Sequence, residues 1–271
     1  MTFPRSQDNR YFSLEGFRGI LTRARSLGYR IVPFRTFEPP GERPVLLLRH
    51  DLDGPLKGAH AKAELEAEVG VNATYFVQTA SDFYNLLSVP NRALLRRLVD
   101  LGHEVGLHYD AKRYLASGAA ALASDLRLLE DLCGQRVLSA SQHIPVEDDA
   151  IAIDRYVEND AYAPRFTQPP MQYISDSLMA WREATPHDLL DRRASFQLLT
   201  HPETWIGGYC DMAEALNGMM SEEIEMVRMR YRDTRAHYMD LLFGREERDR
   251  RFRERRMRPP RDIAGDDGRA S

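Results

Sequence analysis

The sequence predicts an α/β fold in which helices cover both faces of a mainly parallel sheet. Short apolar runs alternate with stretches of helical spacing along most of the 271 residues. The apolar runs lack a polar face, which is typical of strands buried on both sides. The composition, 43% apolar and 29% charged, is that of an ordinary globular domain. No apolar run reaches the ~18 residues that a membrane helix requires.

Seven short apolar runs, bounded by Gly, Pro or polar residues, are expected to form the strands. In chain order they are Arg30–Phe34, Val45–Leu48, Ala73–Val77, Glu104–Leu107, Val137–Ala140, Gln172–Ile174 and Phe196–Leu199.

Helical spacing marks the segments before, between and after these strands. The segments are Leu14–Leu27, Leu56–Val69, Asn91–Leu101, Ala111–Cys133, Asp148–Val157 and Met212–Phe243. Pro90 opens the third segment and Gly102 closes it, while Gly134 closes the fourth. Strands that alternate with helices form either an open doubly wound sheet or a closed or distorted barrel. The sequence contains no glycine-rich phosphate loop, which disfavours the nucleotide-binding open sheets.

Polar side chains gather where the apolar runs stop. Asp51 and Asp53 follow the second run, His108 the fourth, His143 the fifth, and His201 the last. In a parallel α/β barrel all strand carboxyl ends open on one face, where active sites lie. We therefore expect these side chains to converge on one pocket.

The two aspartates suggest a cation. In an extended segment residues i and i+2 point the same way, so Asp51 and Asp53 share one face, and their charges repel unless a cation lies nearby. The alternative is an Asp-rich turn before Gly54 and Pro55. Two histidines and a carboxylate, with a position left for water, form the usual hydrolytic zinc site. His50 would point away from Asp51 if the strand stays regular.

The ordered strand ends resemble the polysaccharide deacetylase superfamily, also called the NodB-homology or carbohydrate esterase family 4 group. The resemblance runs from about Pro44 to Trp205. It rests on the segments Leu48–Gly54, Ala73–Val77, Gly102–His108, Ile174–Ser177 and Leu198–Pro202. It implies a distorted (β/α)7 barrel that removes acyl groups from N-acylated sugars with zinc or a similar divalent ion, Zn²⁺ being the expected cofactor.

The resemblance also implies residue roles. Asp51 matches the general base and Asp53 a metal-binding aspartate. His108 matches the first metal-binding histidine, and His201 the histidine that protonates the leaving amine. Asp176 with Trp181 resembles the motif that orients this histidine and lines the pocket.

The sequence departs from the family pattern at two places. Lys112 stands where a second metal-binding histidine is usual, and Ser141–Pro145 replaces an arginine-and-proline motif. Three readings follow: His143 supplies the missing ligand, Asp110 supplies it, or the chain is a metal-free relative. His50, Tyr109 and Asp110 are expected beside the substrate or behind the ligands.

We expect residues 1–10 to be a flexible N-terminus, 11–244 to be a single barrel domain with an N-terminal and a long C-terminal helix, and 245–271 to be an Arg-rich helix end with a disordered tail. The interleaved acidic residues and the net charge of −4 argue against a nucleic-acid partner. The first ten residues lack the order of a secretion signal, so a cytoplasmic location is expected. The oligomeric state stays open.

The expected activity is metal-dependent removal of an acetyl or formyl group from an N-acylated amino sugar or related glycan intermediate. One alternative is a catalytically silent barrel that binds a glycan or a protein partner. Another is a metal hydrolase of a non-sugar amide or ester. A serine nucleophile is disfavoured because the sequence has no Gly-x-Ser-x-Gly elbow.

Overall fold

A computed structural model describes residues 12–145 and 151–256. These residues form one eight-stranded sheet, and every pair of neighbouring strands is parallel. The strands are β1 (Arg30–Val32), β2 (Val45–Leu52), β3 (Thr74–Val77), β4 (Glu104–Tyr109), β5 (Ser139–Gln142), β6 (Asn159–Asp160), β7 (Met171–Ser175) and β8 (Ser195–Thr200). All seven expected strands are present.

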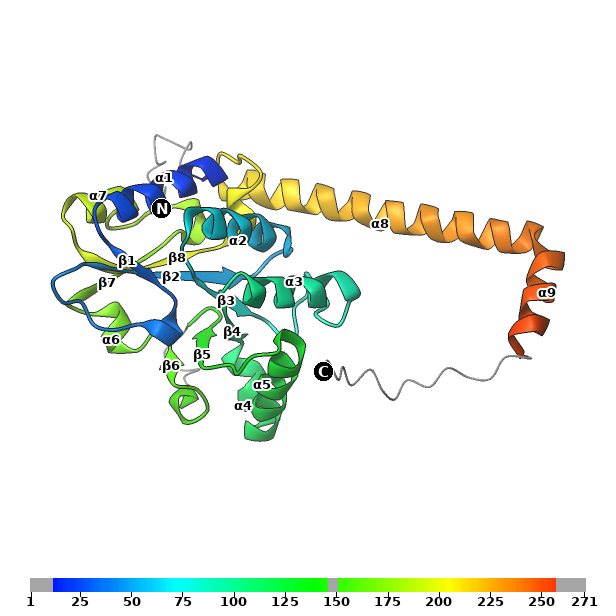
Figure 1. Ribbon diagram of the computed structural model, residues 1–271, viewed down its shortest axis with the longest axis horizontal. Helices are drawn as coiled ribbons and strands as arrows, with labels where there is room; N and C mark the ends of the chain where they lie inside the picture. The colour runs from blue at the N-terminus through cyan, green and yellow to red at the C-terminus, as the bar shows by residue number, and fades with distance from the viewer. Residues whose placement is uncertain (1–11, 146–150, 257–271) are drawn as a thin grey trace, which may run out of the picture. The chain divides into compact units, whose positions relative to one another are not determined.

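The strand order is β6-β5-β4-β3-β2-β8-β7, and β1 pairs with the start of β2. The sheet curls like part of a barrel, but its outermost strands, β6 and β7, do not pair within the described residues (Figure 1). The prediction of an α/β fold of the distorted barrel type is therefore confirmed. The extra strand β6 has two residues and no apolar run, which is why the sequence pattern did not reveal it.

Helices follow most strands (Figure 1). They are α1 (Leu14–Ser26), α2 (Lys57–Val69), α3 (Val89–Asp100), α4 (Ala111–Ser117), α5 (Ala119–Cys133), α6 (Pro164–Thr167), α7 (Pro186–Asp191), α8 (Met212–Phe243) and α9 (Arg245–Arg256), with a 3-10 helix, η6, at Pro202–Trp205. None of these helices has both the length and the apolar content of a membrane span. The chain divides into two compact units, residues 1–217 and 218–271.

Two helix predictions were wrong in detail. The expected helix Ala111–Cys133 is broken at Gly118, whose positive φ of 81° ends α4 before α5 begins. Residues 148–150 of the expected helix Asp148–Val157 lie outside the described residues. The rest of that segment forms only a 3-10 turn, at Ile153–Arg155. The expected flexible residues 1–10 and the tail beyond 256 also lie outside them.

Alternation along β2 places its residues on two different faces. Val45 and Leu47 belong to a buried cluster with Phe76, inside the curled sheet. Arg49 continues on this face, because its guanidinium lies 5.5 Å from the centre of the Phe76 ring. His50 lies on the opposite face, where α2 packs. The inner face of β2 is therefore apolar at its start and charged at its end.

Gly58, in α2, is where the helix meets η6. A Cβ at this position would lie 2.5 Å from the carbonyl oxygen of Pro202 and 2.8 Å from the amide nitrogen of Glu203. Gly58→Ala is therefore expected to lower the free energy of unfolding by about 1–3 kcal/mol, because the clashing atoms are backbone. Urea unfolding followed by circular dichroism measures this change.

The matched control is Gly19→Ala in α1, where a Cβ meets nothing within 4 Å. That change is expected to stabilise the protein by about 0.5–1 kcal/mol, because alanine favours the helix interior. Equal effects at the two positions would contradict the described packing of α2 on η6.

Candidate metal-dependent active site

The carboxyl end of β2 carries a buried ion pair. Nε and Nη2 of Arg49 donate to Oδ1 and Oδ2 of Asp51 at 2.9 and 2.7 Å. The side chains of both residues are at most 3% exposed. Burial alone would raise the pKa of Asp51, but the charges of Arg49 and His108 and the hydrogen bond from Arg49 together outweigh it, and the pKa is lowered. Asp51 is therefore held as a carboxylate.

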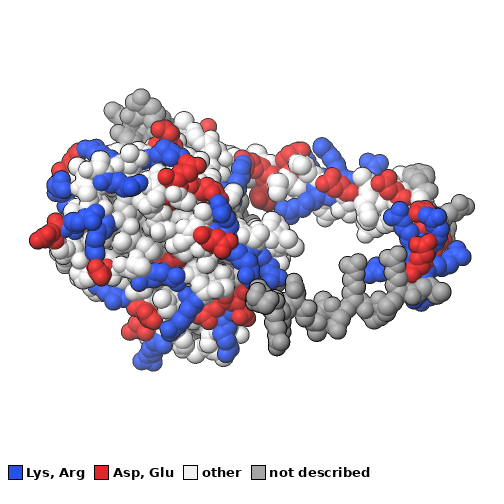
Figure 2. Space-filling model, viewed as in Figure 1, with Lys and Arg blue, Asp and Glu red and all other residues white. Residues whose placement is uncertain are grey.

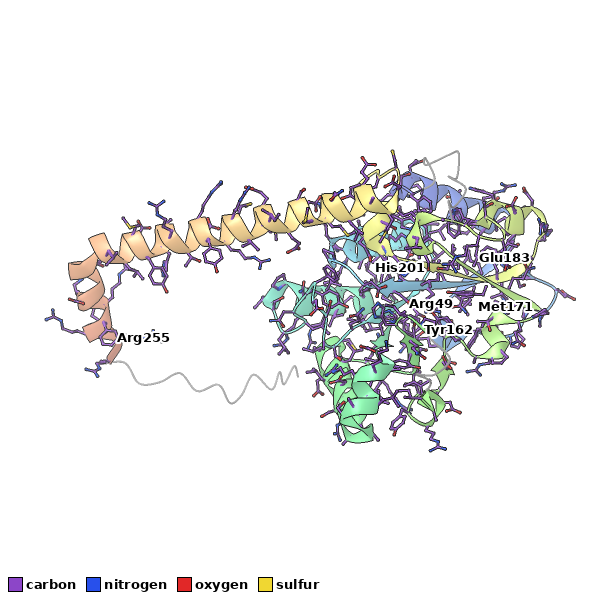
Figure 3. All side chains as sticks on the ribbon, turned by 180° about the vertical axis from the view of Figure 1, so that it is seen from behind. Arg49, Tyr162, Met171, Glu183, His201 and Arg255 are labelled. Atoms are coloured by element: carbon purple, nitrogen blue, oxygen red, sulfur yellow. The ribbon has the colours of Figure 1, made fainter. Side chains whose placement is uncertain are left out.

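Arg49 is itself fixed by neighbours from three other segments. It donates to Oε1 of Gln197 at 3.0 Å, to the hydroxyl of Tyr162 at 3.0 Å and to Oγ of Ser141. Its guanidinium also stacks on the Tyr162 ring, 4.5 Å from the ring centre (Figure 3). Ser141 Oγ donates in turn to Asp51 at 3.1 Å. The orientation of the Asp51 carboxylate is therefore determined by this network.

Replacing Arg49 with Met tests this network. The change is expected to lower the free energy of unfolding by about 3–5 kcal/mol, because it leaves a buried carboxylate without its partner. The control is Arg97→Met, since Arg97 makes a similar two-nitrogen contact with Glu64 on the surface. That change is expected to have a much smaller effect on stability, because water and salt screen an exposed ion pair. If chemical denaturation gives the same loss of unfolding free energy for both variants, burial does not make the Arg49–Asp51 ion pair more important than the surface pair.

Three potential metal ligands meet beside this ion pair. One ligand atom from each of Asp53, His108 and His143 lies within 4.8 Å of the other two. Oδ1 of Asp53 is 2.9 Å from Nε2 of His108 and 3.6 Å from Nε2 of His143. These residues come from the ends of β2, β4 and β5, so the expected convergence of strand ends is observed.

Main-chain contacts orient the imidazole of His108 and fix the backbone of His143. Nδ1 of His108 lies 3.0 Å from the carbonyl oxygen of Ser141, so this nitrogen carries the proton and Nε2 is left as an acceptor. The amide of His143 donates to the carbonyl oxygen of Tyr109 at 2.8 Å. The side chain of Gln78 donates to Oδ1 of Asp53 at 2.9 Å. Burial lowers the pKa of His143 more than the nearby Asp53 raises it, which favours the neutral, ligating form.

His201 lies on the other side of Asp53. Its Nε2 is 3.5 Å from Oδ2 of Asp53, and its Nδ1 is 2.6 Å from Oδ1 of Asp176. Asp176 is 1% exposed, and its Oδ2 accepts from the indole Nε1 of Trp205 and from the amide of His201. Burial alone would lower the pKa of His201, but the charge of Asp176 and its hydrogen bond raise it to about 10. His201 is thus a proton donor at neutral pH.

The other residues predicted for the site differ in their position relative to the three potential metal ligands and His201. Asp110 is the N-cap of α4, accepts from the amide of Lys112 and lines the same cavity as Asp53. Tyr109 is buried and contributes the main-chain contact to His143. Trp181 stacks on Phe12, with ring centres 5.7 Å apart, and Trp205 is the indole that binds Asp176.

His50 lies on the outer face of the sheet, as strand alternation predicts. Its Nε2 is 2.6 Å from Oε1 of Glu66 in α2, and its Nδ1 is 2.7 Å from Oγ1 of Thr200. Lys62 of α2 donates to the same Thr200 oxygen at 2.5 Å. This buried polar network joins α2 to β2 and β8, and it does not contact the three potential metal ligands.

Sequence reasoning missed several residues of the site. Arg49, Trp205 and Ser141 were given no role, although Arg49 shares the face of Asp51 by strand alternation. Glu203 was also missed. It is buried against Gly54, and burial raises its pKa to about 7. Only its position two residues after His201 could have drawn attention to it.

A cavity of about 240 Å³ opens at this site. Its lining combines the three potential metal ligands with the loop after β3 and the start of α4. The lining residues are Asp53, Gln78, Thr79, Ala80, Asp82, Phe83, His108, Asp110, Arg113, Tyr114 and His143. The site is therefore small, polar and open to solvent.

No family model and no curated protein matches this chain. Among solved structures it is similar to a polysaccharide deacetylase from Bacillus cereus, with 15% identity, 67% of this chain and 89% of that chain covered, and a TM-score of 0.42. It is also similar to a family 4 carbohydrate esterase from Bacillus anthracis, with 15% identity, 79% and 86% covered, and a TM-score of 0.40.

A third similar structure is a CE4 family pseudoenzyme from Bacillus anthracis, with 17% identity, 67% of this chain covered and a TM-score of 0.38. The chain spans only 60% of the length of that protein.

Proposed function

We propose that this protein is a metal-dependent deacylase that removes an acetyl or formyl group from an N-acylated amino sugar or a related glycan intermediate. One observation carries the proposal. The ligand atoms of Asp53, His108 and His143 converge within 4.8 Å. They lie between a carboxylate held by Arg49 and an imidazole held by Asp176. The resemblance of the strand-end motifs supports the same activity.

The donor set fits a divalent cation. Nε2 of His108 is buried and makes no hydrogen bond, although Oδ1 of Asp53 lies 2.9 Å away. A short nitrogen–oxygen approach without hydrogen-bond geometry is expected of two ligands that converge on one ion. Two imidazoles and one carboxylate suit Zn²⁺. When bound, such an ion would polarise the amide carbonyl and lower the pKa of an attacking water.

Asp51 is proposed as the general base. Its Oδ2 lies 3.8 Å from Nε2 of His108, next to the three ligands. Arg49 lowers its pKa, so Asp51 can accept a proton only from a strongly acidified water. Arg49 also keeps the carboxylate in one orientation, which favours the transfer of that proton.

His201 is proposed as the general acid. Its Nδ1 stays bound to Asp176 while its Nε2 faces Asp53 across 3.5 Å. The raised pKa keeps a proton on the ring until the amide nitrogen becomes basic in the transition state. Transfer of that proton from Nε2 lets the amine leave as the carbon–nitrogen bond breaks.

The cavity supports a small substrate. About 240 Å³ lies below the usual range of drug-sized pockets, so one acylated sugar unit matches it better than a long polymer. Phe83 on its lining is 57% exposed and offers an apolar ring face, while Asp82 and Asp110 offer acceptors for hydroxyl groups. We propose that these residues bind the sugar.

A second candidate is a catalytically silent barrel that binds a glycan. Lys112 favours it, because this exposed residue stands where the resemblance implies a metal-binding histidine. Metal analysis of the purified protein, followed by acetate and formate release from a panel of N-acylated sugars, distinguishes the candidates. About one equivalent of metal together with release supports the deacylase.

The other outcomes of this experiment count against that proposal. Metal without release, with turnover of simple non-sugar amides or esters, supports the alternative metal hydrolase. Less than about a tenth of an equivalent of metal, with no release after zinc is added, supports the silent barrel.

A further inference from the structure

Helix α8 exposes a line of large apolar side chains. Met220, Ile224, Val227, Tyr231 and Tyr238 are between 43% and 74% exposed, and we call them the α8 stripe. All five lie in the unit formed by residues 218–271. A contiguous exposed apolar surface of this kind on a soluble helix marks an interaction site.

The spacing of the stripe indicates what covers it. From Met220 the steps are four, three, four and seven residues, which place the five side chains at the a and d positions of successive heptads. This 3.5-residue period keeps one seam facing a single partner helix as the two helices supercoil. Arginine and glutamate lie beside the stripe along the helix (Figure 2). Thr234 fills the remaining d position between Tyr231 and Tyr238, so the stripe has the spacing of a short coiled-coil seam with one polar layer.

We infer that α8 forms an antiparallel coiled coil with α8 of a second copy of this chain. With Ile224 packed against Val227 of the second copy, the same register packs Met220 against Tyr231 of the second copy. Each layer then combines an a with a d position, as antiparallel packing requires. The register is self-complementary, since the two-fold axis repeats every contact.

Charge selects this orientation. Glu223 and Arg230 flank the stripe at g positions, and neither forms an ion pair elsewhere in the described chain. The antiparallel register places Glu223 beside Arg230 of the second copy, twice per dimer. A parallel pair would place Glu223 beside Arg228 of the second copy but also Arg230 beside Arg235, so a like-charge contact offsets the favourable one.

The oligomeric state of the full chain tests the inference. Light scattering during gel filtration is expected to give twice the 31.1 kDa of one chain. Replacing Ile224 and Val227 together with Lys is expected to weaken the dimer about 100-fold or more, because it buries charges in an apolar seam. Replacing Met226 and Met229 with Lys is the matched control, since both are exposed on the same helix but lie off the stripe. The control is expected to stay dimeric.

A charge exchange tests the orientation. Glu223→Arg and Arg230→Glu should each weaken the dimer, and the double variant should restore it, because the exchanged charges still meet across the two-fold axis. A monomeric wild type at tens of micromolar would overturn the inference, as would a dimer that survives the Ile224 and Val227 changes. So would a monomer that co-sediments with anionic lipid vesicles through this helix. Failure of the double variant to restore the dimer would exclude the antiparallel register.

Discussion

Replacing Asp51 with Asn is expected to lower kcat by about 10²- to 10⁴-fold, the range that a general base contributes. Asparagine keeps the shape of the side chain but cannot accept a proton. Metal content should stay unchanged, because Asp51 is not one of the three converging ligands. Acetate release at saturating substrate measures the effect.

The stability of this variant must be measured in parallel. The change leaves the buried Arg49 without a carboxylate, so some loss of unfolding free energy is expected. Assays well below the unfolding midpoint separate the two effects. Ser141→Ala is the control, since it removes one hydrogen bond to Asp51 and keeps the carboxylate. Turnover of the Asp51 variant within about tenfold of wild type would remove Asp51 from the role of base.

Replacing His143 with Ala is expected to weaken zinc binding by roughly 100-fold or more. Removing a residue that only hydrogen-bonds to a metal ligand already lowers metal affinity by about 10- to 100-fold, and His143 is proposed as a ligand itself. Turnover should fall with the metal. Competition with a coloured chelator measures the affinity.

Asp110→Ala is the matched control for this change. Asp110 lines the same cavity but does not belong to the group of converging ligands. Its replacement should leave zinc affinity nearly unchanged. If instead Asp110→Ala loses the metal and the His143 variant keeps it, the assignment of the third ligand is wrong. This pair of variants decides between two of the readings that the sequence left open.

The fold could be predicted from sequence because its strands are buried on both faces. Residues such as those of Val45–Leu48 then form apolar runs without alternation, and glycines such as Gly134, with a φ of 76°, end the helices between them. The two-residue strand β6 carries no such signal. Gly118 was hidden inside a helical pattern, because spacing alone does not tell when a glycine adopts a positive φ.

The site could be predicted in part. Strand alternation placed Asp51 and Asp53 together, and the common edge of a parallel sheet brought His108, His143 and His201 to them. Alternation also placed Arg49 on the same face, but its contact with Asp51 depends on a side-chain conformation fixed by Gln197 and Tyr162. Such contacts come from tertiary packing, which no local pattern encodes.

Anomalous diffraction at the zinc edge, from crystals of the protein grown with zinc, shows which side chains hold the ion. One strong peak is expected at about 2.0–2.2 Å from a carboxylate oxygen of Asp53 and a ring nitrogen of each of His108 and His143. A structure without such a peak, or with the ion held by other side chains while these three bind only one another, would contradict the proposed metal site.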